Sequence, residues 1–486
     1  MSTLKTQEEL LDFVEEQVRQ QGNQGAANLA TILKPIVEQL PMGSFNSNEL
    51  PVLDGFNDAG KTAYVKDTRK YATWDGYGWT YMDGKPVTPR YLTFTANGDG
   101  VELAFFFNRN SAGDEQQNPN ITFQKSTDGG LTWEEHTIGV YDPDDGDTSG
   151  LDVIALDEGE SVMFKGVNSE NFTVGDPEND EGIYVGFYLD GSAAASGDIT
   201  SLVNGVGGDV TVQFMQFYSM FYGCTSLTQA PALPATTLAS GCYSSMFSGC
   251  TGLTSTPVLP ATTLASYCYG YMFEGCTSLT QAPALPATTL VSNCYSNMFK
   301  DCTGLTQAPT LPATTLVSGC YGSMFYGCTG LTQAPALLAT TLAEFCYSSM
   351  FYGCTSLTQA PALPATTLAS GCYASMFSGC TGLTQAPALP ATTLASGCYQ
   401  AMFNGCTGIT SHDVATLNNS EDTFKNNSSC ASLTIHAETP PTIHATTITG
   451  LKADCIIYVP AASVNAYKAK QYWSARASYI QAMPSE

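Results

Sequence analysis

The sequence predicts an α+β chain in which a strand-rich region leads into a repetitive solenoid with one short strand and one short helix per repeat. Three observations predict this class. Cysteines recur at a fixed spacing of 26 residues through the second half of the chain. Short runs of alternating apolar and polar residues fill most of residues 90–200. Two stretches with apolar residues at helical spacing open the chain.

Composition excludes several function classes. The 486 residues carry a net charge of −26, and residues 101–219 alone hold 22 acidic and 3 basic side chains. This balance argues against binding to nucleic acid or to an anionic membrane, both of which need a Lys/Arg surface. No run approaches 18 consecutive apolar residues, so no membrane insertion is expected.

Residues 1–42 are predicted to form a helical attachment segment. Thr6 and Glu9 form a capping box, and a second helical stretch runs from about residue 26 to residue 40. The segment lacks the basic start and apolar run of a secretory signal, so export by that route is not expected. The helices either pack on their own domain or dock to a partner. Docking is favoured, and its candidate residues are Leu10, Phe13, Val14, Val18, Leu33 and Val37.

Residues 43–89 are predicted to form a β-hairpin collar. Two strand-like runs, 63–65 and 71–74, lead into the turn Asp75-Gly76, and a third run follows at 79–81. The segment resembles the short hairpins of phage tail fibres and other virion appendages. That resemblance implies a homo-oligomer, with a trimer as the expected state.

Residues 90–205 are predicted to form an acidic, immunoglobulin-like β-sandwich. The run Ser126–Trp133, STDGGLTW, resembles an Asp-box, the hairpin motif of sialidase propellers, in which the aspartate caps a turn. A sialidase needs an arginine cluster, and this region holds only Arg90 and Arg109. A glycan-processing enzyme is therefore the weakest alternative.

An acidic run in the sandwich region offers oxygen ligands for calcium. It misses the EF-hand pattern because Asp147 stands where glycine is required. The alternative is a solvated acidic turn. No other cofactor or metal is expected, and the calcium candidates are Asp142, Asp144, Asp145 and Asp147.

The repeat dominates residues 206–410, which hold seven periods of 26 residues. One cysteine series runs from Cys224 to Cys406 and the other from Cys242 to Cys398. The i, i+4, i+8 spacing of the apolar positions predicts a helix of about two turns, capped by Thr236-Thr237. Residues 227–230 predict a strand that stacks in parallel on its neighbours at roughly 4.8 Å. The predicted repeat core is Cys224, Leu238, Cys242, Met246, Phe247 and Cys250.

These units, such as CTSLTQAPALPATTLASGCYSSMFSG, resemble the BspA-like leucine-rich repeats of anaerobic bacteria and their phages. The resemblance extends to the sandwich before the repeats and to a C-terminal capping region at residues 411–486. It implies a closing strand and helix around residues 457–482.

The regular cysteines suggest a metal array, a disulfide ladder or buried free thiols. Their gaps of 8 and 18 residues do not suit zinc, and the repeats contain no histidine. An odd-membered ladder leaves orphans, and each cysteine occupies an apolar position, so buried thiols are favoured. The four histidines, His136, His412, His436 and His444, accompany no nucleophile motif, and we expect no enzymatic activity.

The sequence therefore predicts a non-enzymatic adhesion protein of a tailed phage infecting gut bacteria, located on the virion. Its N-terminus would dock to other virion proteins, and its solenoid would bind a glycan or protein of the host surface. The alternative is a BspA-like adhesin on the bacterial surface, and a further alternative makes the solenoid a soluble spacer. The repeats are nearly uncharged and rich in Thr, Ser, Gln and Tyr, which suits sugars. Candidate ligand-binding residues are Tyr222, Tyr267, Tyr271 and Tyr326.

Overall fold

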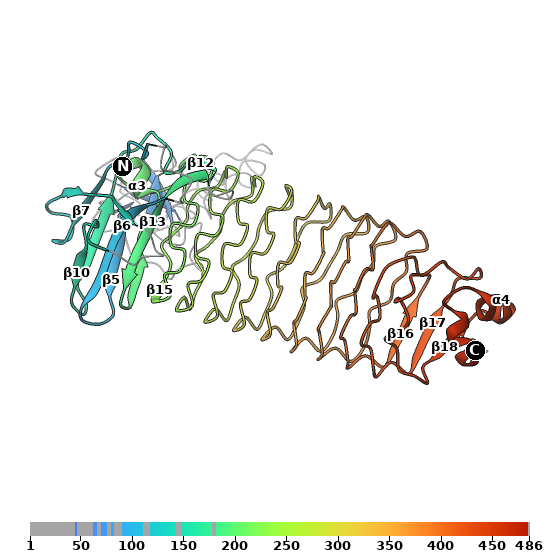
Figure 1. The fold of residues 1–486 in the computed structure, drawn as a ribbon. Helices are drawn as coiled ribbons and strands as arrows, with labels where there is room; N and C mark the ends of the chain where they lie inside the picture. Colours follow the sequence, from blue (N-terminus) through green and yellow to red (C-terminus); the bar gives the residue numbers. More distant parts are fainter. Residues whose placement is uncertain are drawn as a thin grey trace, which may run out of the picture.

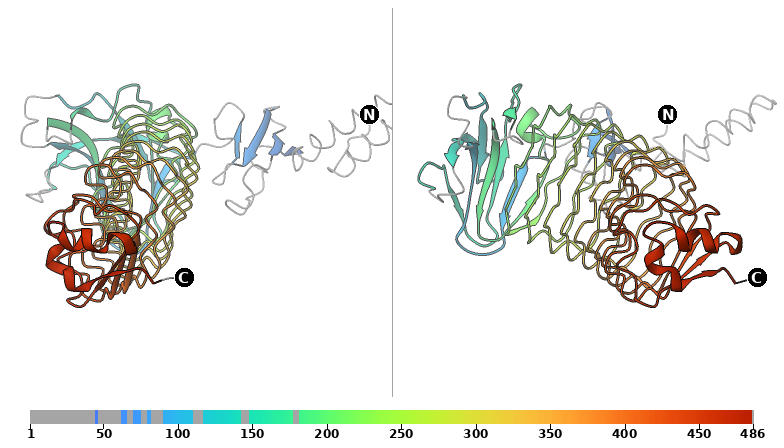
Figure 2. Two further views of the ribbon diagram at one scale, coloured as in Figure 1. Left: turned by 90° about the vertical axis from the view of Figure 1, so that its right-hand side faces the viewer. Right: turned by 45° about the vertical axis from the view of Figure 1, so that its right-hand side comes forward.

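The described part of the chain is elongated, with a β-sandwich at one end, a stack of coils in the middle and short helices at the C-terminal end (Figures 1 and 2). The computed structural model describes residues 44–45, 62–65, 70–74, 79–81, 90–109, 117–141, 148–176 and 181–484. The predicted helices of residues 1–42 lie outside these ranges.

Four short strands precede the sandwich and form one sheet in the order β1-β2-β3-β4. Strands β3 and β4 are antiparallel, and their register pairs Trp74 with Trp79. β2 and β3 are also antiparallel, whereas β1 and β2 are parallel. The strands are β1 (Ser44–Phe45), β2 (Thr62–Val65), β3 (Lys70–Trp74) and β4 (Trp79–Tyr81).

Two sheets form the sandwich and bury a core of phenylalanines between them. Phe94 on one sheet stacks on Phe187 of the other, with ring centroids 4.3 Å apart. One sheet is β10 (Ile154–Leu156), β6 (Val101–Arg109), β13 (Glu181–Asp190) and β12 (Val174–Asp176), with β9 (Gly139–Tyr141) beside β6. The other is β15 (Leu227–Gln229), β14 (Ala193–Ser196), β5 (Leu92–Ala96), β11 (Ser161–Lys165), β7 (Phe123–Ser126) and β8 (Glu134–His136). The immunoglobulin-like assignment stays a prediction.

The sandwich passes into the solenoid without a break in hydrogen bonding. β14 pairs antiparallel with β5 of the sandwich and parallel with β15, which belongs to the first coil. The Cys224 thiol of that coil donates to the Phe187 carbonyl of β13 at 3.2 Å. The short helix α3 (Ser201–Asn204) lies between β14 and β15 in sequence. Both sheets of the sandwich therefore contact the first coil and close the N-terminal end of the coil stack.

The predicted helix in each repeat is wrong, because these residues form successive turns instead. In the coil at 241–249, the N–H groups of Cys242, Ser244, Met246 and Ser248 donate to carbonyls three residues back. The alternating N–H groups of Tyr243, Ser245, Phe247 and Gly249 donate to the next coil, for example Phe247 to Met272 at 2.9 Å. Half of the backbone donors thus join coils to each other, which no α-helix can do.

Left-handed residues set this turn geometry. Gly241, Ser245 and Gly249 have φ values of 62°, 54° and 76°, so every fourth residue is left-handed and no continuous right-handed helix can form. A period of four places Leu238, Cys242, Met246 and Cys250 on one side, as a helix of 3.6 residues per turn also would over a short stretch. The spacing alone could not separate the two structures. Thr236 and Thr237, predicted as a helix cap, are exposed.

The predicted strand in each repeat is also largely wrong. β15 lies in the first coil, and within the described residues 230–410 the later coils are joined by isolated bridges, such as Gln281 with Gln307 and Gln307 with Gln333. The prolines that follow each of these segments remove donors, which limits the ladder. The stacking direction is parallel, as predicted.

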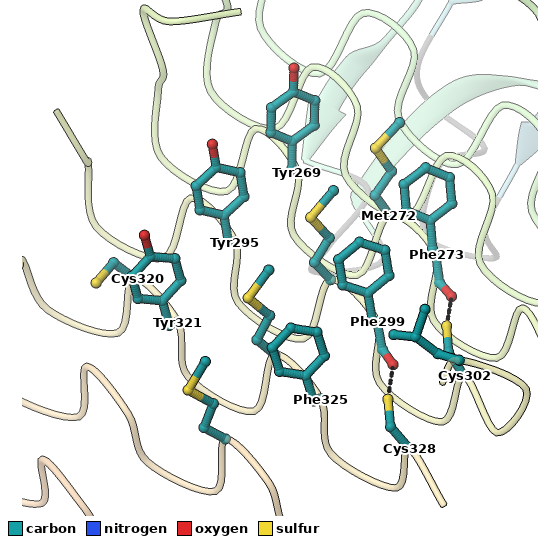
Figure 3. Close-up of a cluster of buried hydrophobic side chains, with 14 of the residues drawn as sticks. Tyr269, Met272, Phe273, Tyr295, Phe299, Cys302, Cys320, Tyr321, Phe325 and Cys328 are labelled. Carbon is teal, nitrogen blue, oxygen red and sulfur yellow. Dashed lines mark hydrogen bonds between the residues drawn. The ribbon is translucent and has the colours of Figure 1, made fainter. Parts of the chain in front are cut away.

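Continuous columns of side chains fill the solenoid (Figure 3). Phe273 and Phe299 of adjacent coils lie 5.6 Å apart with ring planes 7° apart, and Tyr269 and Tyr295 stack in the same way at 5.8 Å. The phenylalanine column begins against the sandwich, where Phe221 packs edge-on to Phe187. The six predicted core residues Cys224, Leu238, Cys242, Met246, Phe247 and Cys250 are all buried in this core.

Coils continue into the region predicted as a cap. Strands β16 (Ser411–Val414), β17 (Ser432–Ile435), β18 (Ile456–Val459) and β19 (Ile480–Ala482) form a parallel sheet in that order. Phe424 extends the phenylalanine column by stacking on Phe403. The elements that close the end are η4 (Ala461–Ser463), α4 (Val464–Ala469) and η5 (Ser474–Tyr479), with Trp473 fully buried beside them.

Candidate functional site

The broadest candidate site is a row of exposed Thr-Gln pairs along the coils. We call it the Thr–Gln face. Its pairs are Thr280-Gln281, Thr306-Gln307, Thr332-Gln333, Thr358-Gln359 and Thr384-Gln385, and all ten side chains are exposed. The backbone of successive pairs is joined by the bridges between Gln281, Gln307 and Gln333, so the pairs stay in register. The face therefore presents a regular, uncharged array of amides and hydroxyls.

The threonines and glutamines of this face have different roles. The Thr306 hydroxyl donates to the Thr280 carbonyl at 3.2 Å, and the Thr332 hydroxyl donates to the Thr306 carbonyl at 3.3 Å. These hydroxyls tie neighbouring coils together, while the glutamine amides carry both donors and acceptors outward. A depression of about 450 Å³ lies on the face between the segments 332–334 and 358–361. A neutral polar ligand can be hydrogen-bonded there without any ion pairing.

The four predicted ligand-binding tyrosines are not brought together. Tyr222 and Tyr326 occupy equivalent positions of the repeat but stand four coils apart, and Tyr267 and Tyr271 lie at two other positions of the coil. Tyr222 is 61% exposed and Tyr267 is 36% exposed, whereas Tyr271 and Tyr326 are half-buried. They do not form a single site.

Tyr326 pairs with a residue that the sequence reasoning missed. Its ring stacks on Tyr352 with centroids 4.4 Å apart and parallel planes. The signal was present, because Tyr352 follows Tyr326 by one period of 26 residues. The same reasoning missed Gln333 and Gln359, which line the depression of the Thr–Gln face.

One small charged cluster interrupts the neutral coils. The Lys300 ammonium lies 2.6 Å from Glu274 and 4.0 Å from Asp301. The hydrogen bond to Glu274 raises the pKa of Lys300. The cluster has a net charge of only −1, and Glu344 is the one further charged residue between residues 220 and 410. Long-range electrostatic attraction by the repeats is therefore weak.

The cysteines are core side chains with no chemical role at the surface. All 17 are buried and free. Burial raises the pKa of Cys242 and of Cys320 to about 12, so both thiols stay protonated at neutral pH. Among the described residues, no group of three or more His, Cys, Asp or Glu side chains is arranged to hold a metal ion.

The Asp-box resemblance corresponds to a structural turn. Asp128 Oδ1 accepts the N–H groups of Leu131 and Thr132 at 3.0 and 2.9 Å. These bonds, led by the hydroxyl of Thr132, lower the pKa of Asp128 to about 2. Trp133 packs edge-on to Tyr91, and the Lys165 ammonium lies 3.9 Å from a ring centroid of Trp133. The Asp128 carboxylate therefore stabilises the loop by accepting hydrogen bonds from within it.

Two predicted sites lie outside the described residues. These are the calcium candidates Asp142, Asp144, Asp145 and Asp147, and the docking residues Leu10, Phe13, Val14, Val18, Leu33 and Val37. Within the described ranges, no helix is long and apolar enough to cross a membrane.

Comparison with known proteins identifies the repeat. Residues 217–332 match the BspA type leucine rich repeat region in six copies. A search of curated proteins finds no match. Among solved structures, a leucine-rich repeat protein from Bacteroides ovatus ATCC 8483 is 17% identical, with a TM-score of 0.24, over 65% of this chain and 91% of that one. The protein thus contains a leucine-rich-repeat region of the BspA type.

Proposed function

We propose that this is a non-enzymatic adhesion protein whose repeats bind an uncharged glycan or protein surface through the Thr–Gln face. The observation that carries the proposal is the row of exposed amides from Gln281 to Gln385, in which backbone bridges hold Gln281, Gln307 and Gln333 in register. A repeated ligand such as a polysaccharide can engage several coils at once. Individually weak hydrogen bonds then add up through multivalency.

We infer that a tailed-phage particle carries the protein, with residues 1–42 as the docking segment. This inference rests on the fibre-like sequence of the collar, where the strands β3 and β4 pair as a hairpin. The alternative carrier is a bacterial cell surface, where BspA-type proteins are typically found, and the repeat match favours it.

The adhesion test uses the full chain, host cells and purified capsular polysaccharide. The double variant Gln333→Lys/Gln359→Lys changes the depression of the Thr–Gln face. The matched control, Thr315→Lys/Thr341→Lys, adds the same charge at exposed positions elsewhere on the coils. We expect adhesion to fall about tenfold or more in the first variant only. Equal loss in both variants, or in neither, contradicts a binding role for this face.

A salt series checks the neutral character of the contact. Adhesion through uncharged groups should change little up to about 0.5 M salt, where charge interactions are screened. A collapse of adhesion over that range would instead assign binding to the acidic sandwich.

The carrier is tested separately by deleting residues 1–42. A virion protein should then remain soluble and bind polysaccharide but fail to co-sediment with particles. Normal incorporation of the truncated chain would disprove docking by these residues. Antibody labelling of intact cells and of purified particles distinguishes the cell-surface alternative.

A further inference from the structure

A pocket lined by aromatic rings lies where the sandwich meets the first coil. It has a volume of about 320 Å³, within the usual range for small-ligand sites. One wall is the outer face of β6, β9 and β13, and the other is the coil segment 219–224. We call it the junction pocket. It is separate from the Thr–Gln face, and its ligand does not depend on the function proposed above.

The sandwich wall of this pocket is unusual for the outer face of a sheet. Phe105, Phe107 and Val185 face the core, so their neighbours Phe106, Asn108 and Tyr184 face outward, where polar side chains are expected. Across the β6–β13 register, Asn108 pairs with Tyr184 and Phe106 pairs with Gly186. The outer face is therefore a patch of rings interrupted by one amide.

The rings are held in fixed orientations. Phe106 and Tyr141 meet edge-on with centroids 4.9 Å apart, and Tyr141 meets Tyr188 in the same manner at 5.8 Å. Gly186 makes room for Phe106, because a Cβ atom there would clash with the Phe106 ring. Such an arrangement leaves ring faces and edges preformed, which reduces the entropy cost of binding.

Polar groups are placed among these rings. The Asn108 amide donates to the Tyr184 hydroxyl at 2.7 Å, and both side chains line the pocket. The phenol accepts this bond and keeps its own proton to donate to another partner. Asn108 is only 8% exposed, so its position is fixed by the surrounding structure.

The charge of the pocket restricts its ligand. The described residues that line it include no Asp, Glu, Lys or Arg. Burial raises the pKa of Tyr184, and burial followed by Asp190 and Glu102 raises the pKa of Tyr188. The phenols therefore stay neutral, and the nearby carboxylates disfavour an anion. Phosphate-bearing and carboxylate-bearing ligands do not fit.

The first coil supplies the rim. Tyr222 lines the pocket and is 61% exposed, which leaves its ring free to cover a ligand. The bond from the Cys224 thiol to the Phe187 carbonyl fixes this coil against β13. The two walls of the pocket are thus parts of one hydrogen-bonded unit.

We propose that the junction pocket binds a neutral sugar residue of a glycan. The C–H faces of a pyranose pack on aromatic rings, and its hydroxyls need neutral donors and acceptors such as Asn108 and Tyr184. The pocket combines both features and lacks the cationic groups that a nucleotide or an acidic sugar requires.

The test uses the full chain and a panel of neutral gluco-, manno-, galacto- and xylo-oligosaccharides. Binding is followed by titration calorimetry and by saturation-transfer NMR. Tyr222→Ala removes an exposed ring and should leave the fold intact, while Tyr472→Ala removes an exposed ring near the C-terminal end and is the matched control. We expect at least one neutral sugar to bind, with an affinity about tenfold lower in Tyr222→Ala and unchanged in Tyr472→Ala.

A second variant tests the pocket at a residue other than the rim residue Tyr222. Asn108→Leu removes the amide, and its thermal unfolding shows whether the sandwich is still folded. A folded Asn108→Leu protein should lose sugar binding. The proposal is overturned if no neutral sugar binds the wild-type chain, if only a protein or peptide occupies the pocket, or if sugar binding is unaffected by Tyr222→Ala. Loss of cell adhesion in the Gln333→Lys/Gln359→Lys variant with sugar binding retained would separate the two sites.

Discussion

The Cys302 thiol donates a hydrogen bond to the carbonyl of Phe273 at 2.9 Å, which joins two neighbouring coils (Figure 3). The same bond links Cys328 to Phe299 at 3.0 Å, and it recurs along the stack from Cys250–Phe221 to Cys406–Phe377. Cysteine suits this position because it fills apolar space and still offers a weak donor to a buried carbonyl. From Cys250 to Cys406, the first cysteine series therefore links neighbouring coils by hydrogen bonds.

The thiols should be silent in the native protein and all reactive after denaturation. Burial holds their pKa values high, as for Cys242, and blocks access to reagents. Titration with an aromatic disulfide should find very few thiols in native protein and close to 17 in denaturant. Seven or more disulfides, in protein whose thiols were blocked at lysis, would contradict this arrangement.

Removal of one tie should loosen its coil. Cys302→Ala creates a small cavity and leaves the Phe273 carbonyl without its donor. A loss of about 2 kcal/mol is expected from these two effects. Because repeat proteins open locally, amide exchange of the coils around residues 273 and 302 is the suitable measurement. The control is Thr303→Ala, at an exposed position next in the chain, which should change exchange little.

The sequence was sufficient to predict the repeat, its parallel stacking and its buried apolar series, because these depend on spacing and polarity. It was not sufficient to predict the backbone within a coil. The spacing of Leu238, Cys242 and Met246 is compatible with a helix. The left-handed φ values at Gly241, Ser245 and Gly249 and the hydrogen bonds between coils exclude it. Ser245 is not a residue type that indicates a left-handed conformation. Tyr271, at the equivalent position of the next coil, is a bulky residue that would argue against one.

The candidate sites were less predictable than the fold. The Thr-Gln repeats are visible in the sequence, but which of their side chains point outward depends on the coil geometry. The junction pocket joins Tyr222 to Asn108 and Tyr184, which are distant in sequence and lie in different elements. Only the pairing of β6 with β13, and of β14 with β15, brings them together.

The left-handed positions predict opposite effects of two small substitutions. Ala401 has φ of 50°, where a Cβ atom is strained, so Ala401→Gly should stabilise its coil by about 0.5–1 kcal/mol. Gly379 has φ of 75°, so Gly379→Ala should destabilise by about 1 kcal/mol. Thermal unfolding and amide exchange compare the two variants. Destabilisation by Ala401→Gly, or stabilisation by Gly379→Ala, would show that the backbone at that position is not left-handed.

Two buried histidines predict a loss of stability in mild acid. His136 lies with Nδ1 3.0 Å from Asp152, and its Nε2 accepts the N–H of Phe105 at 3.2 Å. Burial lowers the pKa of His136 to about 4, even though Asp152 opposes that shift. The His412 ring packs against the rings of both Phe403 and Phe424, and burial lowers its pKa to about 4 as well.

Both shifts act in the same direction on folding. An unfolded histidine takes up a proton near pH 6.5, whereas the folded one stays neutral until about pH 4. The unfolded state therefore binds more protons in this window, and stability falls as the pH is lowered from about 6.5 to about 4. Each histidine contributes at most roughly 3 kcal/mol to the fall.

Chemical denaturation at pH 7, 5.5 and 4.5 measures this fall in the free energy of unfolding. His136→Gln should flatten the dependence in the sandwich and His412→Gln in the C-terminal coils, with amide exchange reporting each region. An unchanged acid dependence in both variants would mean that other groups govern acid unfolding.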